Sequence, residues 1–210
     1  MYRIEFNAPT RDSGYIIQLP ASKSISNRLL LLQYIYSESP EIINLSDSND
    51  TRVLSKALQA LISGSRFIEV EDCGTAMRFL IPVLAATPGN YIISGTSRMH
   101  ERPVADLVDG LRQIGAEIDY MQNEGFPPLN IRGKKLPGGQ IIMDGSISSQ
   151  FISALMMASP LMSGKLEVFL HTGLTSVPYI QMTGELMLQC GIPSGTFDIF
   201  MSESLIKEYE

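Results

Sequence analysis

Three segments of the chain repeat one pattern, in which a turn of small residues leads into a run that is apolar on nearly every face of a helix. The pattern occurs at 24–36, 74–86 and 148–158. A helix that is apolar on all sides must be buried on all sides. The sequence therefore predicts three inner helices, and their need for burial constrains the fold more than any other feature.

Each inner helix is followed, after a nearly constant interval, by a helix of another kind, at 51–62, 103–114 and 178–189. The second of these places Leu107 and Leu111 on one face and Asp109 on the other, which is the pattern of a helix with one buried side. A glycine suited to ending a helix follows each of them, namely Gly64, Gly115 and Gly191.

Strand-like segments separate these helices. They lie at 15–19, 41–45, 67–70, 91–94, 117–120, 141–144, 166–170 and 197–201, with a further short strand at 129–132 in an insertion between Tyr120 and Gly139. The order is that of three strand–helix–strand–helix–strand units, which share a core that no single unit can bury alone. We expect an α/β fold with three buried parallel helices inside and sheets outside, formed by residues 1–210 as a single domain.

If a pseudo-threefold axis relates the units, the N-termini of the inner helices open on one surface. The first turn of a helix carries free N–H groups and a partial positive charge, so this surface is suited to binding an anion. It would collect Ser22–Ser24, Gly74–Thr75 and Ser148–Ser149 together with Lys23, Arg28, Arg78 and Gln150. For the stretch 19–28 alone, a capped helix with two solvated basic residues is the simpler alternative.

Composition limits the classes of function. The 16 Lys and Arg residues against 22 Asp and Glu residues give a net charge of −6, which argues against a general nucleic-acid binder. No apolar run approaches the length that spans a bilayer. Two cysteines and two histidines offer no metal-ligand spacing, and the cysteines suit a reducing compartment. We therefore expect a cytoplasmic protein with neither a membrane nor a nucleic-acid partner.

Several motifs, in order along the chain, resemble those of the EPSP synthase family of enolpyruvyl transferases. They are Leu19–Arg28, Asp47–Arg52, Gly74–Arg78, Arg98–Pro103, Asp144–Phe151 and Ser176–Ile180. The resemblance implies two domains, each of three repeated units, of which this chain matches the N-terminal, substrate-binding one while the second is absent. It implies transfer of the enolpyruvyl group of phosphoenolpyruvate to the 5-hydroxyl of shikimate 3-phosphate, with release of phosphate and without any cofactor or metal.

The same resemblance assigns roles to individual residues. It implies that Ser148, Ser149 and Ser176 hold the phosphate of shikimate 3-phosphate, and that Ser24, Arg28, Gln150 and Tyr179 contact its ring and substituents. Lys23 and Arg102 are implied to bind phosphoenolpyruvate and to serve catalysis, with Lys23 close to the reacting hydroxyl. Gly74 is implied to lie beside phosphoenolpyruvate, where a larger side chain narrows the pocket and affects the inhibitor glyphosate.

Two residues depart from the family pattern. Asp72 stands before the glycine motif, where the family usually has asparagine, and a carboxylate there would repel phosphoenolpyruvate unless it is paired or protonated. Cys73 replaces a small residue and is expected to pack as a small hydrophobe rather than to react as a thiol. Arg78 either positions the glycine turn or contacts substrate.

In this family the acid/base carboxylates come from the second domain, so we expect the chain alone to be inactive and to depend on that domain as a partner. Two alternatives stay open. The chain could be a non-catalytic domain that binds a phosphorylated ligand. It could also belong to the sibling enzyme that transfers enolpyruvate to UDP-N-acetylglucosamine, although Lys23-Ser24 does not match the Lys-Asn pair of that enzyme.

Overall fold

The computed structural model describes residues 20–36, 41–146 and 148–201. Within these residues the α-helices are α1 (Lys23–Ile35), α2 (Asn49–Ile62), α3 (Gly74–Ala86), α4 (Ala105–Gln113), α5 (Ser149–Ala158) and α6 (Val177–Gln189). Three short 3-10 turns are η1 (Met99–Glu101), η2 (Ser159–Leu161) and η3 (Ser194–Thr196). All six predicted helices are therefore confirmed, with boundaries that differ by at most two residues.

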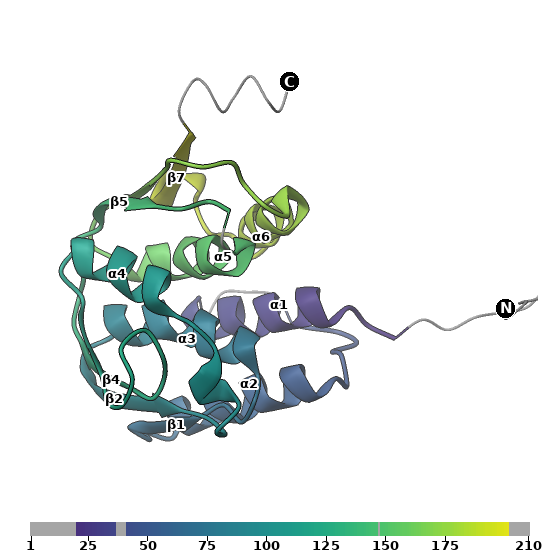
Figure 1. Cartoon of the computed structure of the whole chain (residues 1–210). Helices are drawn as coiled ribbons and strands as arrows, with labels where there is room; N and C mark the ends of the chain where they lie inside the picture. Colours follow the sequence, from purple (N-terminus) through teal and green to yellow (C-terminus); the bar gives the residue numbers. More distant parts are fainter. Residues whose placement is uncertain (1–19, 37–40, 147, 202–210) are drawn as a thin grey trace, which may run out of the picture.

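The strands form two separate sheets (Figure 1). One has the order β1-β2-β4-β3, with β1 parallel to β2 and the other pairs antiparallel; the second has the order β5-β6-β7 and is parallel throughout. The strands are β1 (Phe67–Glu69), β2 (Gly89–Ser94), β3 (Glu117–Tyr120), β4 (Leu129–Gly133), β5 (Gly139–Met143), β6 (Leu166–Leu170) and β7 (Phe197–Met201). The predicted arrangement of helices inside and sheets outside is confirmed, with α3 and α5 lying between the two sheets.

The helices that follow the three inner helices, namely α2, α4 and α6, all end in the same way. The threefold repeat predicted from the sequence is therefore visible in single hydrogen bonds. Gly64, Gly115 and Gly191 follow them with φ angles of +87°, +89° and +80°. In each case the next residue donates its backbone N–H to the carbonyl five residues earlier: Ser65 to Ala60, Ala116 to Leu111, and Ile192 to Met187. This pattern satisfies the last carbonyls of a helix and requires the left-handed conformation that glycine adopts at little cost.

The first of the three units departs from the prediction. The segment 41–45 is not a strand, and Ile43 within it is 86% exposed. A strand needs a neighbour for its backbone N–H and C=O groups, and no described strand lies beside this segment. The expected strand at 15–19 lies outside the described residues.

The same difference explains the partial burial of α1. The helices α3 and α5 are buried on nearly all faces, as predicted, whereas α1 is buried only at Ser26, Asn27, Arg28, Leu31 and Leu32. The expectation that α1 is buried on every face is wrong for the described residues, because neither described sheet covers its outer side. None of the described helices has the length and apolar character needed to cross a membrane.

Candidate functional site

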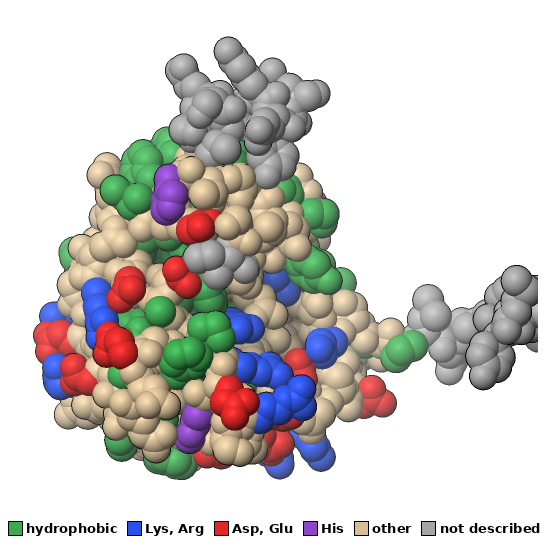
Figure 2. Space-filling model, viewed as in Figure 1, with side chains coloured by type: hydrophobic (Ala, Val, Ile, Leu, Met, Phe, Trp, Pro, Cys, Tyr) green, Lys and Arg blue, Asp and Glu red, His purple; other side chains and the backbone are tan. Residues whose placement is uncertain are grey.

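The N-termini of α1, α3 and α5 meet at one cavity with a volume of about 480 Å3. This volume lies in the range of small-molecule sites. The cavity is lined by Lys23, Ser24, Asn27, Arg28, Thr75, Arg78, Ser148, Ser149, Gln150 and Tyr179. Figure 2 shows several Lys and Arg side chains grouped on the face drawn there. The predicted convergence of three helix N-termini and several cations is therefore present in the fold.

At each of these N-termini, the side chain of the residue just before the helix accepts a hydrogen bond from a first-turn N–H group. The Oγ atom of Ser22 accepts from the N–H of Ile25 at 3.4 Å, and that of Ser148 accepts from the N–H of Gln150 at 3.2 Å. At α3 the Sγ atom of Cys73 takes this role and accepts from the N–H of Ala76 at 3.3 Å. The remaining free N–H groups of the first turns add positive potential around the cavity.

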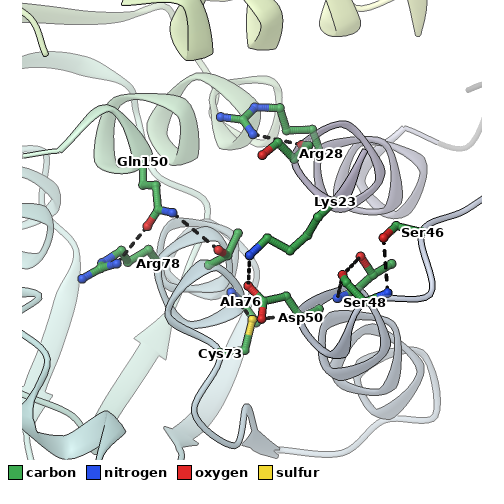
Figure 3. Close-up of polar contacts among 12 residues, drawn as sticks. Lys23, Arg28, Ser46, Ser48, Asp50, Cys73, Ala76, Arg78 and Gln150 are labelled. Carbon is green, nitrogen blue, oxygen red and sulfur yellow. Dashed lines mark hydrogen bonds and ion pairs between the residues drawn. The ribbon is translucent and has the colours of Figure 1, made fainter. Parts of the chain in front are cut away.

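Lys23 extends from the first turn of α1 toward α2 (Figure 3). Its Nζ atom lies 3.0 Å from Oδ2 of Asp50, and the Lys23 side chain is about half exposed. An ammonium group has three donors, so the ion pair with Asp50 leaves capacity for a ligand. Asp50 thereby fixes the position of Lys23 at the cavity.

Arg28 is a buried cation held by neutral groups. Its Nε donates to Oγ1 of Thr183 at 2.6 Å, Nη1 donates to the carbonyl of Ser24 at 3.0 Å, and Nη2 donates to Oγ of Ser153 at 3.1 Å. Burial lowers the pKa of Arg28, and the interaction with Tyr179 partly opposes this shift. In the described part of the chain no carboxylate lies within 4.0 Å of Arg28. A buried charge normally has a counter-ion, so this site is suited to an anionic ligand.

Arg78 and Gln150 join α3 to α5 at the wall of the cavity. Nη1 of Arg78 donates to Oε1 of Gln150 at 2.8 Å, and Nε2 of Gln150 lies 3.4 Å from Oγ1 of Thr75 (Figure 3). Burial lowers the pKa of Arg78, and repulsion by Arg102 lowers it further. Arg78 thus positions Gln150 and lines the cavity.

Gly74 lies against two guanidinium groups. A Cβ atom added to Gly74 would stand 2.6 Å from Nη1 of Arg102 and 3.2 Å from Nη1 of Arg78. Arg102 follows η1, and it approaches the cavity through this contact rather than as one of the lining residues. The glycine therefore allows Arg102 and Arg78 to come together beside the first turn of α3.

The structure places the predicted site residues in two groups. It brings together Lys23, Ser24, Arg28, Ser148, Ser149, Gln150 and Tyr179 around the cavity, with Gly74 and Arg102 beside it. Asp72 and Ser176 are not among the lining residues. Ser176 is exposed at the start of α6, with a φ angle of +55°, and makes no capping hydrogen bond. Among the described residues, no group of His, Cys, Asp and Glu side chains is arranged to hold a metal ion.

Cys73 is packed as a small buried side chain, as the sequence predicts. The side chain is 2% exposed, and burial raises the pKa of its thiol from its ordinary value near 9 to about 11. The N–H of Ala76 opposes this shift only in part. A protonated, buried thiol is a poor nucleophile, so we assign Cys73 to capping and packing.

We expect the raised pKa of Cys73 to make the chain less stable in alkali. Between pH 9 and 11 the unfolded thiol loses its proton before the folded one, so the free energy of unfolding falls as pH rises. A pKa difference of two units between the folded and unfolded states lowers the free energy of unfolding by roughly 2–3 kcal/mol across this pH range. Urea unfolding at pH 8 to 11 should show this loss in the parent and a shallower one in Cys73→Ala. Equal slopes in the two proteins would contradict the assignment, since the tyrosines are common to both.

Comparison with known proteins identifies the family. The family model described as EPSP synthase (3-phosphoshikimate 1-carboxyvinyltransferase) matches residues 64–196. The chain belongs to the EPSP synthase family. It is 47% identical over 175 residues to the 3-phosphoshikimate 1-carboxyvinyltransferase of Bacteroides fragilis (strain YCH46), covering 83% of this chain and 42% of the relative. It is 44% identical over 216 residues to the enzyme of the same name from Paraburkholderia phymatum, covering 91% and 50%.

A solved EPSP synthase from Acinetobacter baumannii shares the fold, with a TM-score of 0.66 at 21% sequence identity. The match covers 73% of this chain and 40% of that structure. The chain thus spans about half the length of the curated EPSP synthases it matches. The family resemblance inferred from the motifs is confirmed.

Sequence reasoning missed several residues that shape this cavity. Ser153 and Thr183 hold Arg28 and are fully buried in α5 and α6, and Asn27 is buried at the cavity itself. Ser153 is a polar residue inside the apolar run of α5, but nothing in the sequence links it to Arg28, and Thr183 lies in α6 among other polar residues. Asn27 lies within the recognised motif at 19–28, four residues after Lys23 and therefore on the same face of α1.

Proposed function

We propose that this chain is the shikimate 3-phosphate-binding half of an EPSP synthase. The full reaction transfers the enolpyruvyl group of phosphoenolpyruvate to the 5-hydroxyl of shikimate 3-phosphate and releases inorganic phosphate. One observation carries the proposal most directly: the cavity contains the buried guanidinium of Arg28, which has hydroxyl and carbonyl partners but no carboxylate among the described residues. An anionic, hydroxyl-bearing ligand supplies what this site lacks.

The phosphate of the substrate binds at the start of α5. Ser148 and Ser149 present hydroxyls there, next to the free N–H groups of the first turn, and this combination is typical of phosphate sites. Ser176 completes the phosphate site in our proposal. It lies outside the lining of the described cavity, at the start of α6, and its hydroxyl makes no capping bond.

The ring of the substrate lies against Ser24, Arg28, Gln150 and Tyr179. These residues come from α1, α5 and α6, so the ring is held between three helices. Arg28 and Gln150 are fixed by their own hydrogen bonds before any ligand arrives. Such preorganisation lowers the entropy lost on binding.

Lys23 and Arg102 bind phosphoenolpyruvate. A guanidinium matches the planar geometry of a carboxylate, and an ammonium is a compact charge that can also donate a proton. In the reaction, the 5-hydroxyl gives up its proton as its oxygen adds to C2 of phosphoenolpyruvate, and C3 gains a proton. The tetrahedral intermediate then loses phosphate from C2 and a proton from C3, which restores the double bond. Lys23 stands beside the reacting hydroxyl. Asp72 lies outside the lining of the described cavity, and its carboxylate repels phosphoenolpyruvate unless it is paired or protonated.

The acid/base carboxylates of the reaction come from the other half of the enzyme, which is the partner of this chain. We therefore propose that the chain alone binds shikimate 3-phosphate but does not turn over. Its proposed location is the cytoplasm, and the free thiols of Cys73 and Cys190 are compatible with a reducing compartment.

The test measures binding and turnover separately. Calorimetry should show saturable binding of shikimate 3-phosphate and much weaker binding of shikimate, which lacks the phosphate. With phosphoenolpyruvate present, phosphate release should be absent for the chain alone and should appear when the C-terminal half of the Bacteroides fragilis relative is added. Equal affinity for both ligands, or none for either, would contradict the proposed substrate; turnover by the chain alone would contradict the need for a partner.

Replacing Gly74 with alanine should weaken phosphoenolpyruvate binding. The added methyl group displaces the guanidinium of Arg102 from its present position, 2.6 Å away. Because that group is the mobile end of a long side chain, stability should change by less than about 1 kcal/mol. We expect about a tenfold rise in the Kd of phosphoenolpyruvate, measured in the presence of shikimate 3-phosphate. The control is Gly195→Ala, where a Cβ atom meets open space; equal Kd values for the two variants would count against the role of Arg102.

A further inference from the structure

Asn27 has a buried side chain whose polar atoms are unpaired. It is 1% exposed, and neither Oδ1 nor Nδ2 has a hydrogen-bond partner among the residues that the structure describes. A buried amide without partners carries a substantial desolvation cost, and such groups are uncommon in native proteins. The side chain lines the cavity, between Lys23 one turn earlier and Arg28 next to it.

Unpaired polar atoms occur in α1 at the cavity, whereas the neighbouring polar side chains of the helix have hydrogen-bond partners. The neighbouring Ser26 accepts from the N–H of Ser46 at 3.0 Å, and Arg28 is held by several hydrogen bonds. In the described residues, four buried side-chain polar atoms lack a partner: both amide atoms of Asn27, Nε of Arg78 and the hydroxyl of Tyr120. Three of the four belong to residues that line this cavity.

The chemistry of the amide narrows the ligand group that it can meet. An unprotonated phosphate or carboxylate oxygen only accepts, so it satisfies Nδ2 and leaves Oδ1 unpaired. A hydroxyl both donates and accepts, and two adjacent hydroxyls satisfy the two ends of one amide. Assigning the two amide ends the other way round does not change this requirement.

We infer that Asn27 is a substrate-contacting residue that pairs with the free hydroxyl groups on the ring of bound shikimate 3-phosphate. The inference rests on the proposed function and adds a residue to the site. Asn27 forms hydrogen bonds with the ring hydroxyls, whereas the neighbouring cations and helix N-termini bind the charged groups of the ligand. No covalent role is assigned to it.

The inference predicts opposite effects on stability and binding. Asn27→Leu replaces the amide with an apolar group of similar shape, so the ligand-free chain should gain about 2–4 °C in Tm as the unpaired atoms disappear. The same change should raise the Kd of shikimate 3-phosphate about tenfold, for the loss of two neutral hydrogen bonds. Asn27→Ala should lose affinity equally without filling the cavity, which separates loss of the amide from steric exclusion. Asn90→Leu, on the exposed part of β2, is the matched control.

The measurements are calorimetry with shikimate 3-phosphate and thermal unfolding of the 210-residue chain with increasing inorganic phosphate. Phosphate should stabilise the Asn27 variants as much as it stabilises the parent, because it lacks the pair of adjacent ring hydroxyls that matches the two ends of the amide. Unchanged affinity for shikimate 3-phosphate, a drop in the Tm of ligand-free Asn27→Leu, or an equal loss of phosphate binding would each overturn the inference. If the parent itself does not bind shikimate 3-phosphate, the proposed function fails and the inference fails with it; binding by the parent and by both variants alike overturns the inference alone.

Discussion

Replacing Arg28 with methionine is expected to raise the Kd of shikimate 3-phosphate about 100-fold. The guanidinium is buried at the cavity, and no carboxylate near it in the described chain neutralises its charge. A bound anion therefore interacts with the whole positive charge of Arg28. Hydrogen bonds to charged groups contribute about 1.5–3 kcal/mol, and each 1.4 kcal/mol is a factor of ten in Kd. Calorimetric titration of the parent and the variant measures this change directly.

The same substitution should leave the ligand-free chain as stable as the parent or more stable. Methionine fills much of the volume of arginine, and it removes a buried charge whose desolvation opposes folding. Oγ1 of Thr183 keeps its hydrogen bond to the carbonyl of Tyr179 at 2.7 Å and its contact with Oγ of Ser153 at 3.0 Å. Arg132→Met, at an exposed ion-pair site on β4, is the control and should bind like the parent. A large loss of stability in Arg28→Met without loss of affinity would show that Arg28 is structural.

Phe79→Ala should cost about 3–5 kcal/mol of unfolding free energy. Phe79 is fully buried in the middle of α3, an inner helix that is buried on nearly all faces, and its ring lies 5.4 Å from the guanidinium carbon of Arg28. Truncation leaves a cavity where helices from different units meet. Urea unfolding followed by circular dichroism gives the value, and Phe67→Ala on β1, where the side chain is 55% exposed, is the control. A cost below about 1 kcal/mol would contradict a core organised around α3.

The helices could be predicted from sequence because their signals are local. The apolar run of α3 indicates that this helix is buried, and the glycines after α2, α4 and α6 indicate where those helices end. Each signal depends on residues within one or two turns of the helix. A strand depends instead on a partner elsewhere in the chain. The segment 41–45 has the composition of a strand, but in the described structure it has no neighbour and remains coil.

The candidate site divides in the same way. Lys23, Arg28 and the serines at the start of α5 belong to motifs that can be read from the sequence. The groups that hold Arg28 cannot, since Ser153 is 125 and Thr183 is 155 residues away from it along the chain. The pairing of Lys23 with Asp50 and the unpaired amide of Asn27 likewise arise only from tertiary packing.

The central claim is that an anion site exists where the three inner helices begin, and that the hydroxyls at the start of α5 form part of it. Calorimetric titration with shikimate 3-phosphate should show saturable binding by the parent and none by Ser148→Ala/Ser149→Ala at the same concentrations. Ser22→Ala removes the corresponding cap of α1 without removing a lining hydroxyl, so it controls for the loss of a helix cap and should bind. Undiminished binding by the double variant would contradict the account.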